Sequence, residues 1–321
     1  MMPWQITRQK HRLVRQASAV ILYTWFIVCF FILIGHRPVF SEGKAPTETF
    51  NKLSEFDHKP EIAEHPWIER ALALGFSEQF GFSSLPLRAL AREATHPGAK
   101  RLIVFIESDG APWQAAGYRP PSNPTPKAPI SLQMALHTPT GDQLLYLGRP
   151  CQFIGSAHQF FKTCEDARWW TSWRFAPKVI KAYQEAILGY QARHNAERLV
   201  IAGFSGGGSL AAQIATGVKQ IDRFSAICLI TIASPLDLNA WAKHHRLSFF
   251  KDVVDVDLLK QTLVDIPSAF AFGDADRKVP IESAGALLRD PRLVDKVHHY
   301  IGLKHNDDWV DHWPELLRKA C

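Results

Sequence analysis

The sequence contains few cysteines, five in 321 residues, and none of them belongs to a metal-binding pattern. Cys151 and Cys164 are close in sequence, but no second Cys/His pair stands near them at zinc-ligand spacing. The chain also lacks internal repeats, a P-loop and a G-x-G-x-x-G motif. These absences argue against a structural zinc site and a phosphate-cradling glycine loop, so we expect no metal and no organic cofactor.

Acidic residues are absent from the first 40 positions, which hold five basic residues. Since the whole chain has a formal net charge of +6, the remaining 281 residues carry only +1. They contain no nucleic-acid-binding motif or basic stripe, so we expect no nucleic-acid partner. The chain is 46% hydrophobic and 21% charged, which excludes wholesale disorder and provides for a sizeable core.

A long apolar run occupies residues 16–35 and contains no charged residue. At about 1.5 Å per helical residue, a run of this length spans the ~30 Å of bilayer hydrocarbon. Four basic residues precede it, so the positive-inside rule predicts that residues 1–15 form a cytoplasmic tail. We expect a signal-anchor in the inner membrane, with the rest of the chain on the periplasmic or extracytoplasmic side. The competing interpretation is a cleaved signal peptide and a chain secreted to the periplasm.

Residues 36–65 are polar, contain three prolines and read as a linker, whereas residues 66–321 read as one α/β domain. Short apolar runs alternate there with helical patterns, which is typical of a parallel sheet covered on both faces. The expected strands are Arg101–Glu107, Gln143–Leu147, Arg198–Gly203, Ala226–Ile232, Ala269–Phe272 and Val297–Ile301, with an earlier strand pair in Phe80–Arg92. The expected helices are His65–Leu74, Ile130–His137, Pro177–His194, Gly207–Gly217, Asp255–Val264, Ile281–Leu288 and Asp308–Lys319.

A G-x-S-x-G motif follows one of these strands, where Gly203-Phe204-Ser205-Gly206-Gly207 leads directly into a helical pattern. In this strand–turn–helix setting the serine occupies a sharp turn, and its neighbours must be small for strand and helix to approach. The helix N-terminus places N–H groups and a positive dipole beside the hydroxyl. The motif therefore predicts that Ser205 is a nucleophile.

A nucleophilic serine needs a base, and the base needs a carboxylate. Two later strands each lead into a polar turn, the first containing Asp274 and Asp276 and the second containing His305. Ligands bind at this edge of open α/β sheets, which makes Asp276 a candidate acid and His305 the preferred base. Asp274 and Asp237 are rival positions for the acid.

Taken together, these motifs resemble those of the α/β-hydrolase superfamily, over the chain from about Phe80 onward. Gly203–Gly207 is similar to its nucleophile elbow, Asp276–Pro280 to its D-x-x-V-P acid segment, and Gly302–His305 to its histidine loop. The chain further resembles an exported bacterial subgroup of this superfamily. The resemblance implies an α/β-hydrolase fold: a mostly parallel central sheet with helices on both faces, preceded here by the transmembrane helix.

The resemblance also implies an oxyanion hole built from two backbone N–H groups. The first belongs to Gly206, and the second comes from the loop Glu107–Trp113, where Gly110 and Ala111 are the candidates. Pro112 is excluded because it has no N–H. In the same loop, Asp109 and Trp113 are candidate pocket residues, as is Asp237 elsewhere.

Cys151 and Cys164 lie 13 residues apart in a loop-like stretch. In an oxidising compartment we expect them to form a disulfide worth about 3 kcal/mol and to support the rim of the active site. Two unpaired thiols are the alternative.

The sequence therefore predicts a membrane-tethered serine hydrolase that cleaves a small-molecule or acyl ester through an acyl-enzyme on Ser205. A serine peptidase of the same fold needs the same residues and is the alternative within enzymes. A catalytically silent, membrane-anchored binding module is the alternative outside them. The sequence does not define the oligomeric state.

Overall fold

The computed structural model describes residues 65–79, 83–96, 98–113, 119–154, 162–248, 250–285 and 287–321. The predicted cytoplasmic tail and the predicted transmembrane segment 16–35 lie outside these residues, as does nearly all of the predicted linker. Within the described ranges, no helix is both long enough and apolar enough to cross a membrane.

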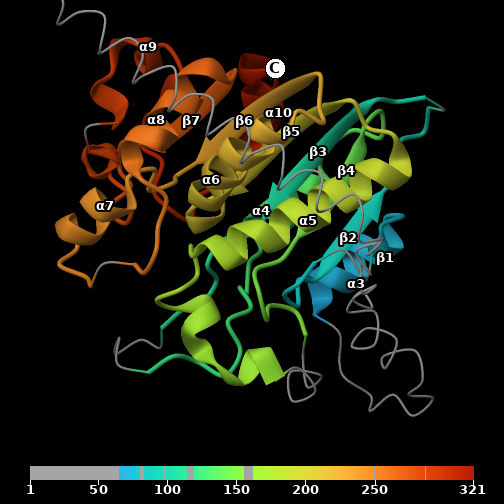
Figure 1. Cartoon of the computed structure of the whole chain (residues 1–321), viewed down its shortest axis with the longest axis horizontal. Helices are drawn as coiled ribbons and strands as arrows, with labels where there is room; N and C mark the ends of the chain where they lie inside the picture. The colour runs from blue at the N-terminus through green and yellow to red at the C-terminus, as the bar shows by residue number, and fades with distance from the viewer. Residues whose placement is uncertain are drawn as a thin grey trace, which may run out of the picture. The chain divides into compact units, whose positions relative to one another are not determined.

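The described part of the chain is built around an eight-stranded sheet with the order β1-β2-β4-β3-β5-β6-β7-β8 (Figure 1). Strand β2 runs antiparallel to both of its neighbours, and the pairs from β4 through β8 are all parallel. The strands are β1 (Ser77–Gln79), β2 (Ala89–Arg92), β3 (Arg101–Ile106), β4 (Gln143–Leu147), β5 (Arg198–Phe204), β6 (Ala226–Ile232), β7 (Ser268–Gly273) and β8 (Val297–Tyr300).

Helices connect these strands and cover both faces of the sheet. They are α3 (Pro66–Ala73), α4 (Ile130–Leu136), α5 (Pro177–His194), α6 (Gly206–Ile221), α7 (Leu238–His244), α8 (Val256–Asp265), α9 (Pro291–Val294) and α10 (Trp309–Ala320). Short 3₁₀ turns lie at Lys162–Glu165, Ala167–Trp170, Ile281–Ala284 and Leu287–Arg289.

The two faces of the sheet carry separate apolar cores because successive side chains of a strand point to opposite sides. In β3, Leu102 and Val104 belong to one core, whereas Ile103 and Phe105 belong to the other. Helices α5, α6 and α8 cover the first core, and Figure 1 shows α5 and α6 lying across that face. Helices α3, α4 and α10 cover the second core. The expected sheet with helices on both faces is therefore confirmed.

Most of the predicted elements are confirmed to within a few residues at their ends. The expected strand pair within Phe80–Arg92 is partly wrong, because β1 lies earlier, at Ser77–Gln79. The expected helix Ile281–Leu288 is also wrong: two 3₁₀ turns flank Gly285, whose φ of 62° interrupts helical geometry. Helices α7 and α9 were not predicted, since both are short.

Candidate active site

Ser205 sits on the tight turn between β5 and α6. Its φ of 54° and ψ of −128° lie in a region that residues other than glycine rarely occupy. The turn is fixed from the neighbouring strand, because the Ser205 N–H donates to the carbonyl of Ile232 at 2.8 Å. Backbone strain of this kind persists only where surrounding structure imposes it, and it commonly marks a functional site.

The glycines around Ser205 are required by the close approach of strand, helix and loop. A Cβ atom on Gly203 would lie 2.4 Å from the carbonyl carbon of Gly207. One on Gly207 would lie 2.3 Å from the carbonyl oxygen of Ile106, at the end of β3. The sequence argument that small residues are needed here therefore has a direct steric basis.

Three side chains from separate loops meet at the carboxyl edge of the sheet. The Nε2 atom of His305 lies 3.0 Å from the Ser205 hydroxyl, and its Nδ1 atom lies 2.7 Å from Oδ2 of Asp276. Ser205 follows β5, Asp276 follows β7 and His305 follows β8, as expected from the sequence. Both His305 and Asp276 are buried, so their hydrogen bonds are shielded from water.

Asp276 is held as an ionised carboxylate by several donors. Burial acts to raise its pKa, but the hydrogen bond and charge interaction with His305 and two backbone hydrogen bonds outweigh burial and lower it. The two backbone donors are the N–H groups of Lys278 and Val279, at 2.8 and 2.9 Å from Oδ1. One oxygen of Asp276 thus anchors the loop, while the other is directed to the imidazole.

His305 is in turn held by the start of α10. The indole N–H of Trp309 donates to the carbonyl of His305 at 3.1 Å, and Trp309 is fully buried. The imidazole also lies 5.1 Å, centroid to centroid, from the ring of Phe204. The histidine loop is therefore fixed by packing on the second core.

The rival acids are occupied elsewhere. Asp274 accepts a hydrogen bond from the N–H of Gly302 at 2.5 Å. Asp237 caps α7 by accepting from the N–H of Ala240 at 2.9 Å. Of the three aspartates, the one that hydrogen-bonds to His305 is therefore Asp276.

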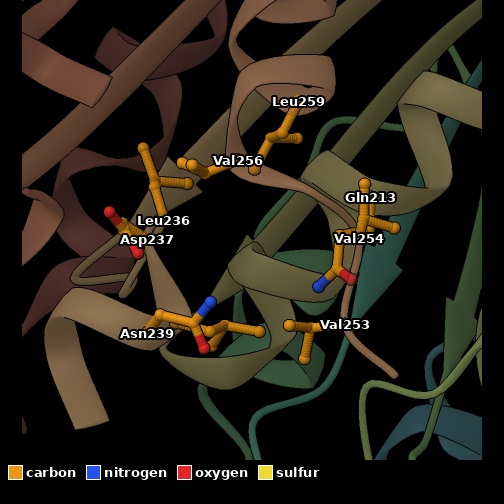
Figure 2. Close-up of a pocket in the computed structure, with 9 residues that line it drawn as sticks. Gln213, Leu236, Asp237, Asn239, Val253, Val254, Val256 and Leu259 are labelled. Carbon is orange, nitrogen blue, oxygen red and sulfur yellow. The ribbon is translucent and has the colours of Figure 1, made fainter. Parts of the chain in front are cut away.

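Asp237 does line a small pocket, which Figure 2 shows in close-up. The other lining residues come from α6, α7, α8 and the segments before α7 and α8, and they are Gln213, Leu236, Leu238, Asn239, Val253, Val254, Val256 and Leu259. The free volume of about 10 Å³ has room for roughly one water. The other two candidate pocket residues, Asp109 and Trp113, do not line it.

The loop after β3 provides the second side of the site. The N–H of Ala111 donates to the carbonyl of Pro124 at 3.1 Å, so it is not free to serve as an oxyanion donor. Of the two candidates that the sequence offered in this loop, Gly110 and Ala111, only the Gly110 N–H stays available. Among the described residues, no acceptor meets the N–H of Gly206, Gly110 or Asp109. The Asp109 N–H is a candidate that the sequence analysis missed.

Glu107 fixes the beginning of this loop from beneath. Its buried carboxylate accepts hydrogen bonds from the N–H groups of Ser108 (2.8 Å) and Leu132 (3.2 Å) and from the hydroxyl of Tyr146 (3.1 Å). Burial raises the pKa of Glu107, against the opposing effect of these donors. The carboxylate joins the loop to α4 and β4 and so restrains its path.

Cys151 and Cys164 form a disulfide, with Cα atoms 5.6 Å apart, which confirms the predicted pairing. The residue next to Cys151 contacts the loop after β3, since the Gln152 amide donates to the carbonyl of Ser108 at 3.0 Å. The disulfide-closed segment therefore supports that side of the site. No group of three or more His, Cys, Asp or Glu residues within the described ranges has the arrangement of a metal site.

The sequence analysis also missed two arginines beside Asp109. Arg149 and Arg174 both pair with its carboxylate, at 2.9 and 2.8 Å. Both arginines are buried. The only sequence signal was the position of Arg149 two residues after the end of strand β4.

Comparison with known proteins adds evidence on the fold. The sequence matches no protein-family profile and no curated protein. An esterase from Pyrococcus furiosus is 12% identical with a TM-score of 0.50, and the match covers 81% of this chain and 97% of the other. An α/β serine hydrolase homologue from Coxiella burnetii is 11% identical with a TM-score of 0.47, covering 77% and 97%. An acylaminoacyl peptidase from Pyrococcus horikoshii is 16% identical with a TM-score of 0.45, covering 72% and 38%.

The strand order, the antiparallel β2 and the similarity to the Pyrococcus furiosus esterase structure define the fold. This chain has the α/β-hydrolase fold, as the sequence motifs predicted.

Proposed function

We propose that the protein is a serine hydrolase that cleaves a carboxylic ester through an acyl-enzyme on Ser205. The observation that carries the proposal is the continuous hydrogen-bonded series from Ser205 through His305 to Asp276, with contacts of 3.0 and 2.7 Å. A silent binding module has no need of this arrangement, nor of a serine in strained backbone geometry.

In the proposed reaction, His305 takes the proton of the Ser205 hydroxyl as its oxygen attacks the ester carbonyl. The resulting tetrahedral oxyanion is held by the Gly206 N–H and by an N–H of the loop after β3. His305 then protonates the departing alcohol, which leaves the acyl group on Ser205. It next removes a proton from a water molecule, whose oxygen attacks the acyl carbonyl, and it returns this proton to the Ser205 oxygen as the acyl–oxygen bond breaks and the carboxylic acid leaves. Asp276 orients the imidazole and stabilises its protonated form throughout.

An ester is the preferred substrate class, and the substrate is a small molecule or an acyl ester. The Pyrococcus furiosus neighbour is described as an esterase, which agrees with this preference. Peptide cleavage uses the same nucleophile, base and oxyanion hole, so activity assays on both kinds of substrate are needed to distinguish an esterase from a peptidase.

The test is a panel of esters, thioesters and peptides assayed on the full-length protein purified in detergent, beside Ser205→Ala. A fluorophosphonate probe reports the nucleophile directly. We expect ester turnover and labelling in the wild type and neither in folded Ser205→Ala. Labelling that persists in the variant overturns the proposal, and turnover of peptides alone replaces the ester by a peptide substrate.

We further propose that residues 16–35 tether the domain to the inner membrane, with the active site on the extracytoplasmic side. The length of the uncharged run and the preceding basic residues support this orientation. The Cys151–Cys164 disulfide also supports it, since disulfides persist mainly in oxidising compartments.

A reporter that is active only in oxidising compartments, fused after residue 60, tests the orientation. We expect reporter activity and retention of the protein in the membrane fraction after a high-salt wash. Activity of a cytoplasmic reporter at the same position reverses the orientation, and release into the soluble periplasmic fraction favours a cleaved signal peptide.

A further inference from the structure

The carboxylate of Asp109 is clamped between two buried arginines. Its Oδ1 atom pairs with Nη1 of Arg149 at 2.9 Å, and its Oδ2 atom accepts a hydrogen bond from Nε of Arg174 at 2.8 Å. The exposed fractions of the arginine side chains are 2% and 6%, against 17% for Asp109. Three charges are thus gathered away from water with a net charge of +1.

The arginines are themselves fixed. Arg149 donates to the carbonyl of Arg174 at 2.7 Å, and Arg174 donates to the carbonyl of Thr171 at 2.9 Å. The guanidinium of Arg174 lies 5.2 Å from the centroid of the Phe175 ring and 4.4 Å from that of Phe250. Both arginines are buried, and the acidic side chain that both pair with is Asp109.

On its other side, Asp109 presses against the nucleophile elbow. A Cβ atom on Gly206 would lie 2.3 Å from Oδ1 of Asp109 and 2.5 Å from Oδ2. The carboxylate therefore occupies the space that any side chain at Gly206 would need. Asp109 belongs to the loop after β3, and its carboxylate lies between this loop and the elbow, the two segments that supply the candidate oxyanion donors.

We propose that Asp109 is a positioning residue that sets the separation between the elbow and the loop after β3, and so the geometry of the oxyanion hole. This inference rests on the proposed hydrolase function. Arg149 and Arg174 hold the carboxylate in place and offset its charge, because an uncompensated carboxylate beside the oxyanion would oppose the negative charge that develops there. The clamp acts on the transition state, in which the oxyanion forms, more than on ground-state binding.

The test compares Asp109→Asn and Asp109→Ala with a matched control, Asp142→Asn. Asp142 also pairs with an arginine: it accepts hydrogen bonds from Nε and Nη2 of Arg101 at 2.8 and 2.6 Å. The Asp142 side chain is 16% exposed, close to the value for Asp109. Arg101 begins β3 and Ile106 ends it, so the control lies about 17 Å from the site along the strand. Asp142→Asn therefore also removes a carboxylate that pairs with an arginine, but it does so away from the proposed oxyanion hole.

The measurements are kcat, KM and affinity for a boronic acid that forms a tetrahedral adduct with the serine. We expect kcat to fall about 10²-fold in both Asp109 variants, by analogy with loss of one oxyanion donor, with KM within about threefold. Boronate affinity should fall in parallel with kcat, and Asp142→Asn should change none of the three. A purely structural clamp would lower the melting temperature and leave kcat and boronate affinity unchanged in the folded variants.

Removing Asp109 leaves two arginines buried without their counter-charge, which endangers folding. The double variant Asp109→Asn with Arg174→Met keeps the net charge at +1 and supplies the fallback. We expect it to fold and to show the same loss of kcat and boronate affinity. Wild-type values in the folded double variant, or kcat unchanged or raised in the folded single variants, overturn the inference. Failure of the hydrolase proposal is distinguishable, because the wild type itself then neither turns over esters nor binds the boronate.

Discussion

The carbonyl group of Gly207 occupies the space in which a side chain on Gly203 would have to lie. A Cβ atom there would be 2.4 Å from the carbonyl carbon and 2.5 Å from the oxygen, and both are backbone atoms, which cannot rotate away as the end of a side chain can. We expect Gly203→Ala to lower the free energy of unfolding by roughly 1–3 kcal/mol, as overpacking of a core does. It should also slow fluorophosphonate labelling, because the displaced elbow carries Ser205. Chemical denaturation and labelling kinetics measure the two effects.

Gly217 in α6 supplies the control for this prediction. A Cβ atom there would meet Nε2 of Gln184 at 1.9 Å, which is the far end of a flexible side chain that can rotate away. Alanine inside a helix is favoured over glycine by up to ~1 kcal/mol, so Gly217→Ala should be neutral or stabilising. If Gly203→Ala were as stable and as reactive as Gly217→Ala, the steric account of the elbow would be wrong.

Replacement of Asp276 by asparagine should reduce kcat by about 10⁴-fold while the domain stays folded. An amide keeps the shape of the side chain but cannot stabilise the imidazolium, and it favours the wrong tautomer of His305. Asp237→Asn is the control, because asparagine also caps a helix well and α7 should persist. Steady-state kinetics on both variants decide the matter, and equal losses would mean that the acid has been assigned to the wrong loop.

Acid should destabilise the wild-type protein partly through Asp276. The pKa of this carboxyl is lowered in the folded state, so the unfolded chain binds a proton more readily between the two pKa values. The stabilising contribution is complete above the ordinary pKa of aspartate, about 4, and is lost as pH falls through the folded-state value. Asp276→Asn should therefore show a shallower fall in unfolding free energy below about pH 4.

Asp290 contributes to the same acid-dependent loss and has to be separated from Asp276. Its pKa is also lowered, chiefly by its hydrogen bond to Arg292. The comparison is consequently made in an Asp290→Asn background, with urea titrations at several pH values. Identical slopes with and without Asp276 would contradict the expected linkage.

The disulfide should resist alkylation and contribute to stability. Under non-reducing conditions, a thiol reagent applied to the unfolded chain should modify Cys228 and Cys321, which the structure shows as free, and leave Cys151 and Cys164 unmodified. Peptide mapping provides the readout, with Cys228 and Cys321 as internal controls. Replacing both bonded cysteines by serine should lower the unfolding free energy by about 3 kcal/mol.

The same double replacement tests the contact between this loop and the active site. Because Gln152 holds the carbonyl of Ser108, loosening the segment should raise KM or lower kcat modestly, while Ser205 still reacts with the probe. Complete loss of labelling in a folded double variant would show that the disulfide does more than support the rim.

The sequence by itself determined the alternation of strands and helices, the elbow at Ser205 and the order of nucleophile, acid and base. Each of these rests on a local requirement. A sharp strand-to-helix turn needs glycines beside the serine, and short apolar runs bounded by turns favour buried parallel strands. Where local preference was weak, as in the 3₁₀ turns around Gly285 and the short helix α7, the sequence did not predict the element correctly.

Only the tertiary structure decided which groups act together. The choice of Asp276 over Asp274 depends on which carboxylate lies within 2.7 Å of His305, a contact between residues 29 positions apart. Asp109 meets Arg174 across 65 positions. The Ala111 N–H is not a free oxyanion donor, because it donates to the carbonyl of Pro124. Such contacts arise where the loops of separate parallel strands converge at one edge of the sheet, and no local pattern along the chain encodes the distance between them.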